Sequence, residues 1–122
     1  MPNATLHGRL ILVVEDQPLI ALDITRELEA AGAAVTSIDT LRHALLVAEN
    51  DDLSGAILDH GLSDGNSSLL CQRLTERGIP YILYTGFPYV EGCCSSALRM
   101  TKPAGEGELS AALALLIGEP KT

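Results

Sequence analysis

The chain has 122 residues, of which 47% are hydrophobic and 20% charged, and its formal net charge at pH 7 is −8. This length fits one compact domain, and the composition is that of a globular protein rather than a disordered one. The negative charge argues against nucleic acid as a partner, because nucleic-acid binders need a basic surface. No stretch approaches the roughly 20 apolar residues of a membrane span, and no secretory signal is recognisable. We therefore expect a single cytoplasmic domain over residues 1–122, with its core at about 9–117, that does not contact membranes.

Short aliphatic segments alternate with helical patterns along the chain. Residues 10–14 form a continuous aliphatic run, which predicts a buried strand. From Pro18 the apolar residues recur every three or four positions, which predicts a helix ended by Gly32 in the left-handed conformation. A second strand is expected at about 34–38, and Thr40 is suited to cap the helix that follows it.

The second half of the chain repeats this alternation. The expected elements are a strand at 55–58, a helix at about 67–77, a strand at 81–84, a weaker strand at 98–101 and a last helix around 109–117. Alternating strands and helices predict an α/β fold with a parallel sheet covered on both faces. Five strands at this length fit a flavodoxin-like, doubly wound (βα)5 architecture with strand order 2-1-3-4-5. Ligands of such sheets bind beyond the carboxyl ends of the strands, where the first and third strands lie side by side.

Chemically distinctive side chains follow the predicted strands. Glu15 and Asp16 come after the first strand, and Asp59 ends the third. Thr85 ends the fourth strand and Lys102 ends the fifth. Any one of these residues is more often a solvated loop residue than part of a site. Their joint occurrence at one edge of a parallel sheet favours a functional site.

Three carboxylates at this edge suit a metal-assisted phosphoryl transfer. A carboxylate can attack phosphorus, but the phosphate that it approaches carries the same charge. Magnesium relieves this repulsion, and it prefers carboxylate, carbonyl and water oxygens as ligands. We predict that Mg²⁺ is bound by Glu15, Asp16, Asp59 and the backbone carbonyl of Gly61. Asp59 is also the predicted nucleophile and phosphoacceptor.

Two further side chains complete the predicted site. Lys102 is expected to pair with one phosphoryl oxygen, and the hydroxyl of Thr85 to hydrogen-bond another. Other reactive side chains receive no such role. Strand alternation points His60 away from Asp59, so we expect His60 to pack or to lie at the surface. The cysteines are expected to be reduced thiols, because an odd number with two adjacent is a poor disulfide framework; they are Cys71, Cys93 and Cys94.

Four short motifs resemble the signature of response-regulator receiver domains of the CheY-like type. They are Leu12-Val-Val-Glu-Asp16, Ile57-Leu-Asp59, Tyr84-Thr-Gly86 and Thr101-Lys-Pro103. The resemblance implies magnesium-dependent phosphorylation of Asp59 by a sensor histidine kinase or a phosphotransfer protein, and a cis peptide before Pro103. It also implies a stand-alone module that signals through protein–protein contacts or drains phosphate from a shared kinase, as a monomer or weak homodimer. The downstream target is not identified.

Two departures from the receiver pattern concern the residues that are expected to respond to phosphorylation. Receivers usually carry an aromatic residue three positions before the lysine, and here that position is Arg99. The segment between Thr85 and Lys102 is short and contains glycine and proline, which disfavours a full fourth helix. Both features resemble a receiver subgroup with a Phe-Ala-Thr-Gly-Tyr motif, here Leu83-Tyr-Thr-Gly-Phe87. We therefore predict an output surface at residues 86–96. The aromatic residues in and beside it, Tyr81, Tyr84, Phe87 and Tyr89, are expected either to pack in the core or to bind a partner.

Other functions remain as alternatives. The first is a receiver-like interaction module that acts without phosphorylation, although the acceptor, the lysine and the acid pair are all present. An aspartate-nucleophile phosphatase on the same fold usually needs a second acid two residues after the nucleophile, and that position is Gly61. A flavodoxin-like cofactor binder is disfavoured because the first strand–helix loop is acidic and would repel a phosphate group in the absence of a metal ion. We therefore expect no enzymatic activity beyond the chain's own phosphorylation and dephosphorylation.

Overall fold

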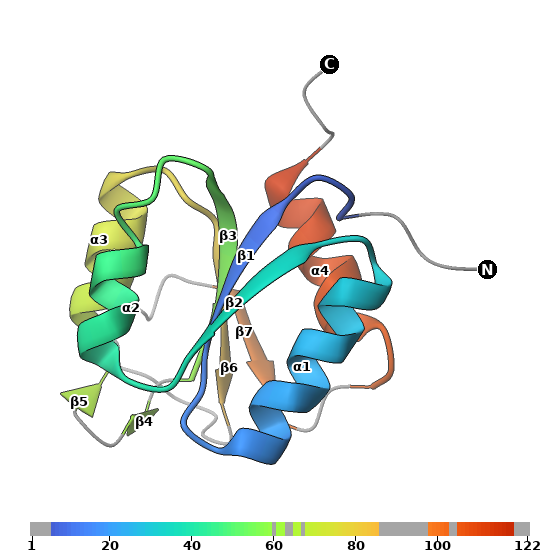
Figure 1. Ribbon diagram of the computed structural model, residues 1–122, viewed down its shortest axis with the longest axis horizontal. Helices are drawn as coiled ribbons and strands as arrows, with labels where there is room; N and C mark the ends of the chain where they lie inside the picture. Colours follow the sequence, from blue (N-terminus) through green and yellow to red (C-terminus); the bar gives the residue numbers. More distant parts are fainter. Residues whose placement is uncertain are drawn as a thin grey trace.

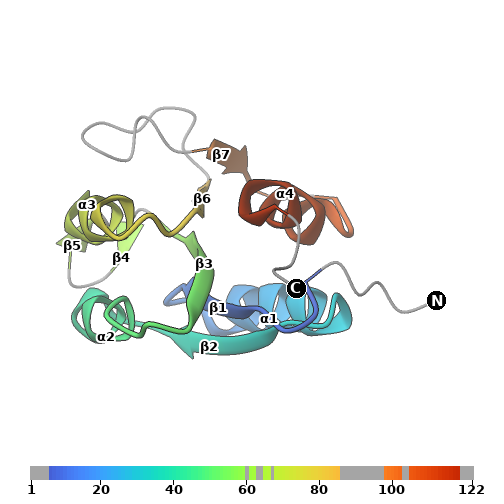
Figure 2. The ribbon, with the colours of Figure 1, turned by 90° about the horizontal axis from the view of Figure 1, so that it is seen from above.

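The computed structural model describes residues 6–59, 61–62, 65–66, 68–85, 98–102 and 105–118. A parallel five-stranded sheet lies between two pairs of helices (Figure 1). From one edge to the other its strands are β2 (Ala34–Ile38), β1 (Leu10–Val14), β3 (Leu53–Leu58), β6 (Tyr81–Thr85) and β7 (Leu98–Thr101). This is the predicted flavodoxin-like order 2-1-3-4-5, and Figure 2 shows it from above.

The helices divide between the two faces of the sheet. One face is covered by α1 (Pro18–Ala30) and α4 (Glu108–Ile117), and the other by α2 (Leu41–Val47) and α3 (Ser68–Glu76) (Figures 1 and 2). Each strand supplies alternate residues to the two faces. The side chains that pack toward α1 and α4 include Ile11, Val13, Ile57, Ile82 and Tyr84. Those that pack toward α2 and α3 include Leu12, Val14, Ala56, Leu58 and Leu83.

The predicted ends of the helices are found with their expected chemistry. Gly32 follows α1 with φ of +97°, a conformation that L side chains rarely adopt. The backbone N–H of His43 donates to the side-chain oxygen of Thr40 at 3.3 Å, which caps α2 as predicted. Gly78, beyond α3, also has a positive φ of +68°.

Three features differ from the sequence predictions. The third strand begins at Leu53, two residues earlier than expected. The loop expected after Asp59 contains a small antiparallel ladder of β4 (Gly61–Leu62) and β5 (Gly65–Asn66). Cys71 is disulfide-bonded rather than a free thiol, and the chain's other cysteines lie outside the described residues.

Ion pairs connect α3 and the residue after it to the turn between α2 and β3. The Arg73 guanidinium makes two contacts of 2.6 Å with the carboxylate of Glu49, and Arg77 lies 2.7 Å from Asp51. The hydrogen bond from Arg73 lowers the pKa of Glu49 below its ordinary value of 4.5. No helix among the described residues is long and apolar enough to cross a membrane.

Candidate functional site

Backbone pairing continues one residue past the ends of β1 and β3. The N–H of Glu15 donates to the carbonyl of Ile38 at 3.0 Å, and the N–H of Asp59 donates to the carbonyl of Val14 at 2.9 Å. Glu15 and Asp59 are thereby held at the carboxyl edge of the sheet, the lower edge in Figure 1. This is the position that the doubly wound topology predicts for a ligand site.

Three carboxylates meet at this edge as predicted. One oxygen from each of Glu15, Asp16 and Asp59 lies within 4.8 Å of the others. Glu15 and Asp59 are buried, with 2% and 9% of their surface exposed. Grouped carboxylates repel one another unless a cation lies between them. Their oxygen donors and close grouping fit a small, hard divalent cation such as magnesium.

Lys102 is the basic residue of the site, and it contacts two of the acids. Its Nζ lies 2.7 Å from Oε1 of Glu15 and 3.6 Å from Oδ2 of Asp59. The other carboxylate oxygen of Glu15 accepts a hydrogen bond of 3.3 Å from the backbone N–H of Gln17. Both oxygens of this buried carboxylate therefore have partners. The sequence predicted Lys102 at this edge but did not predict its contact with Glu15.

A buried aromatic ring lies beneath the lysine and was not predicted as part of the site. The ammonium of Lys102 lies 5.6 Å from the centre of the Tyr84 ring, and Tyr84 is only 7% exposed. Strand alternation could have predicted the contacts of Lys102 with Glu15 and with Tyr84. Glu15, Asp59 and Tyr84 share a face with Val13, Ile57 and Ile82 respectively, all of which pack toward α1 and α4. Lys102 shares that face with Met100.

The remaining predicted site residues are placed only in part. Thr85 ends β6 and is paired with Thr101 of β7, so its position at the carboxyl edge is confirmed, whereas the role of its hydroxyl stays a prediction. Gly61 lies in β4, and its carbonyl as a metal ligand likewise stays a prediction. Arg99 is exposed on β7, as its charge requires. The predictions that concern His60, Pro103, the output surface at 86–96 and the Phe87 end of the subgroup motif lie outside the described residues.

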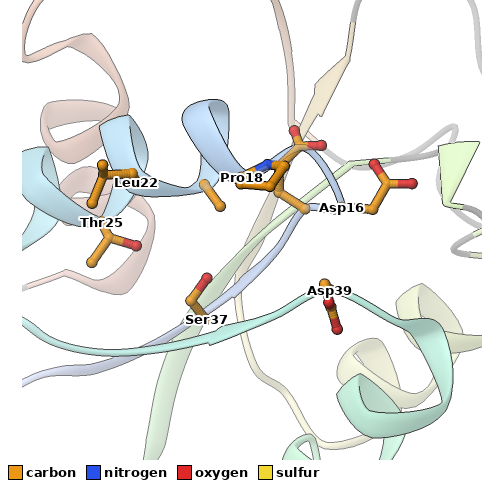
Figure 3. A pocket seen from close by; sticks show the side chains of 8 residues that line it. Asp16, Pro18, Leu22, Thr25, Ser37 and Asp39 are labelled. Carbon is orange, nitrogen blue, oxygen red and sulfur yellow. The ribbon is translucent and has the colours of Figure 1, made fainter.

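A cavity adjoins the acids between α1 and β2 (Figure 3). Its volume is about 490 Å³. In Figure 3, Pro18, Leu22 and Thr25 line it from α1, while Ser37 and Asp39 line it from β2 and the turn after it. Because Glu15 and Asp16 also line this cavity, it is continuous with the carboxylate site.

Comparisons with known proteins agree with this geometry. No protein-family model matches the chain. The phyllosphere-induced regulator PhyR of Methylorubrum extorquens is 35% identical over 82 residues, which cover 64% of this chain. The matched region is only 31% of that regulator's own length.

Solved structures match over nearly the whole chain. The receiver domain of a sensor histidine kinase from Pseudomonas aeruginosa, described with magnesium coordinated in its active-site cleft, is 25% identical with a TM-score of 0.81; the match covers 92% of this chain and 99% of that one. A CheY-like receiver from Methanospirillum hungatei is 24% identical with a TM-score of 0.80 and coverages of 89% and 93%. The anti-anti-sigma factor PhyR from Bartonella quintana is 22% identical with a TM-score of 0.74 and coverages of 93% and 50%.

These likenesses coincide with the acids and the lysine at the carboxyl edge of the sheet. The sheet order is that of the matched receivers, and the three acids and Lys102 stand where the receiver-like motifs placed them. The chain therefore has the fold of CheY-like receiver domains, and it is similar over nearly its whole length to the receiver domain of a sensor histidine kinase.

Proposed function

We propose that Asp59 accepts a phosphoryl group, in a magnesium-dependent reaction, from a phosphohistidine of a sensor histidine kinase or phosphotransfer protein. Phosphorylation of Asp59 would then alter the binding of a downstream protein. The observation that supports this most is the position of Lys102, 3.6 Å from Asp59 and 2.7 Å from Glu15. A partly buried cation beside the acceptor provides a positive charge for the anionic group that arrives there.

The proposed step uses the chain's own carboxylate as the nucleophile. A carboxylate oxygen of Asp59 attacks phosphorus, and an O–P bond forms while the P–N bond to the donor imidazole breaks. The imidazole leaves with the electron pair of that bond. Magnesium bound by Glu15, Asp16 and Asp59 would supply charge neutralisation at the phosphoryl oxygens. Lys102 contributes a further positive charge and stays beside the product.

The comparisons support two parts of this proposal: the binding of magnesium, and the passing of the signal to another protein. The Pseudomonas aeruginosa receiver is described with magnesium in its cleft. The Bartonella quintana relative is described as an anti-anti-sigma factor, and this chain spans half of it. We extend to this chain only the proposal that its signal passes to another protein. The chemistry modifies the chain itself, and we assign no other catalytic activity to it.

A small phosphodonor tests the proposal directly. Wild type incubated with acetyl phosphate and Mg²⁺ should gain the mass of one phosphoryl group, measured on the intact protein, and chelation of the metal should prevent the gain. Asp59→Asn should gain none. Asp52→Asn, which changes an exposed aspartate away from the site, should behave as wild type. An unmodified wild type would favour the interaction module that acts without phosphorylation, and an equal gain in Asp59→Asn would move the acceptor elsewhere.

A further inference from the structure

The ammonium of Lys102 has a neutral neighbour in addition to its two acids. Its side chain is 18% exposed and its Nζ lies 5.6 Å from the centre of the Tyr84 ring. This distance falls within the range of a cation–π contact, in which the negative face of a ring attracts a cation. Tyr84 is 7% exposed and packs in the core on the side of α1 and α4. The ring is therefore fixed by its surroundings.

The fold explains why these two side chains meet. Tyr84 is paired in register with Met100 across β6 and β7, and Lys102 is two residues beyond Met100 on the same face. The ammonium of Lys102 therefore lies near the Tyr84 ring as well as near Glu15 and Asp59. Arg99, in the position where receivers usually carry an aromatic residue, is exposed. In this chain an aromatic ring beside the lysine comes from the neighbouring strand.

The two acids cannot hold Lys102 in every state of the proposed cycle. Glu15 becomes shared with a metal ion once magnesium binds, and Asp59 loses its free carboxylate once it is phosphorylated. A lysine head freed from Glu15 would regain several rotamers of its long side chain and lose its position. The Tyr84 ring is uncharged and binds neither the metal nor the phosphoryl group. Its attraction for the ammonium therefore persists while the anionic partners change.

We propose that Tyr84 is a positioning residue for Lys102, and that its ring keeps the ammonium at the carboxyl edge when Lys102 exchanges Glu15 for a phosphoryl oxygen. The inference rests on the proposed phosphorylation of Asp59. It assigns Tyr84 a role that depends on the aromatic ring and not on the phenol hydroxyl.

Three variants separate the ring from its hydroxyl and from core packing. Tyr84→Phe keeps the ring, and Tyr84→Leu and Tyr84→Met remove it while leaving an apolar side chain. Tyr81→Leu is the matched control, because Tyr81 is an equally buried tyrosine of β6 that packs on the opposite face of the sheet. With acetyl phosphate and magnesium, Tyr84→Leu and Tyr84→Met should phosphorylate about fivefold more slowly than wild type, the factor expected of one partly desolvated cation–π contact. Tyr84→Phe and Tyr81→Leu should stay near the wild-type rate.

A spectroscopic measurement tests the contact without any phosphorylation. The ring current of Tyr84 should shift the ε-methylene protons of Lys102 upfield of those of Lys121, the chain's other lysine. The shift should survive in Tyr84→Phe and Tyr81→Leu and disappear in the ring-free variants. An unshifted Lys102 in wild type would overturn the inference even if the ring-free variants proved unstable, and so would wild-type phosphorylation of Tyr84→Leu. A wild type that shows the shift but is never phosphorylated would instead refute the proposed function.

Discussion

Replacing Lys102 by methionine should destabilise the magnesium-free protein and make its stability depend strongly on magnesium. The change removes the cation that lies 2.7 Å from Glu15 and 3.6 Å from Asp59. It leaves three carboxylates within 4.8 Å of one another. Two unit charges about 4 Å apart interact by about 4 kcal/mol at the effective dielectric typical near a protein surface. Breaking a buried ion pair costs about 3–5 kcal/mol, and the partial exposure of Lys102 places the expected loss at the lower end, about 3 kcal/mol.

Urea denaturation followed by circular dichroism measures this effect. In the presence of a chelator, Lys102→Met should lose about 3 kcal/mol of unfolding free energy relative to wild type, a large share of the stability of a small domain. Saturating magnesium should narrow the gap, because the ion replaces the lost positive charge and no longer competes with Lys102 for Glu15. Arg26→Met, which removes an exposed cation, controls for net charge and should change stability little. A gap that is unchanged by magnesium would refute the argument.

Three other predictions follow from the same structure. Asp16→Ala should nearly abolish magnesium-dependent phosphorylation by acetyl phosphate while keeping the wild-type circular dichroism spectrum, and a wild-type rate would remove Asp16 from the metal site. Gly32→Ala should lower the unfolding free energy by about 1–2 kcal/mol, because φ at this position is +97°, and unchanged urea midpoints would contradict this. The stability that Glu49 gains from its lowered pKa is lost as the pH falls through its folded pKa; Arg73→Ala should return this pKa toward 4.5 in an NMR titration, and an unmoved pKa would show that Arg73 is not the cause.

The strands and the edge of the sheet could be predicted because their signals are local. Continuous aliphatic runs marked β1 and β6, and the predicted bounds of β2 and β7 agree with the structure. Once the topology was fixed, the residue after each strand had to lie at the carboxyl edge. The identity of the residue after each strand and the order of the strands were therefore enough to predict that the acids and Lys102 lie together. The β4–β5 ladder was missed because strands of two residues carry no periodicity.

The contacts within the site depend on finer geometry than the motifs carry. The motifs state which strand each residue follows, and they leave open which acid the lysine meets. In the structure that choice follows from alternation and burial. Glu15 and Asp59 lie on the face shared with Tyr84, and Glu15 is the more deeply buried of the two acids, with 2% of its surface exposed against 9%. An ionised carboxylate in that position needs a cation or hydrogen bonds most, and Lys102 lies closer to it than to the phosphoacceptor.

This pairing has a consequence for the proposed switch. Because the shorter contact of Lys102 is with Glu15, the proposed metal ion at Glu15 would compete with the lysine for this carboxylate before any phosphoryl group arrives. In the proposed cycle, metal binding and release of Lys102 would be coupled, and phosphorylation would offer the freed ammonium a new anionic partner. The loss of Glu15 as a partner would favour movement of the Lys102 ammonium toward the phosphoryl group. The proposed contact with the Tyr84 ring would limit the distance that the ammonium moves. The proposed coupling requires a lysine that can change partners, and the flexible side chain of Lys102, whose ammonium lies near a fixed ring, meets that requirement.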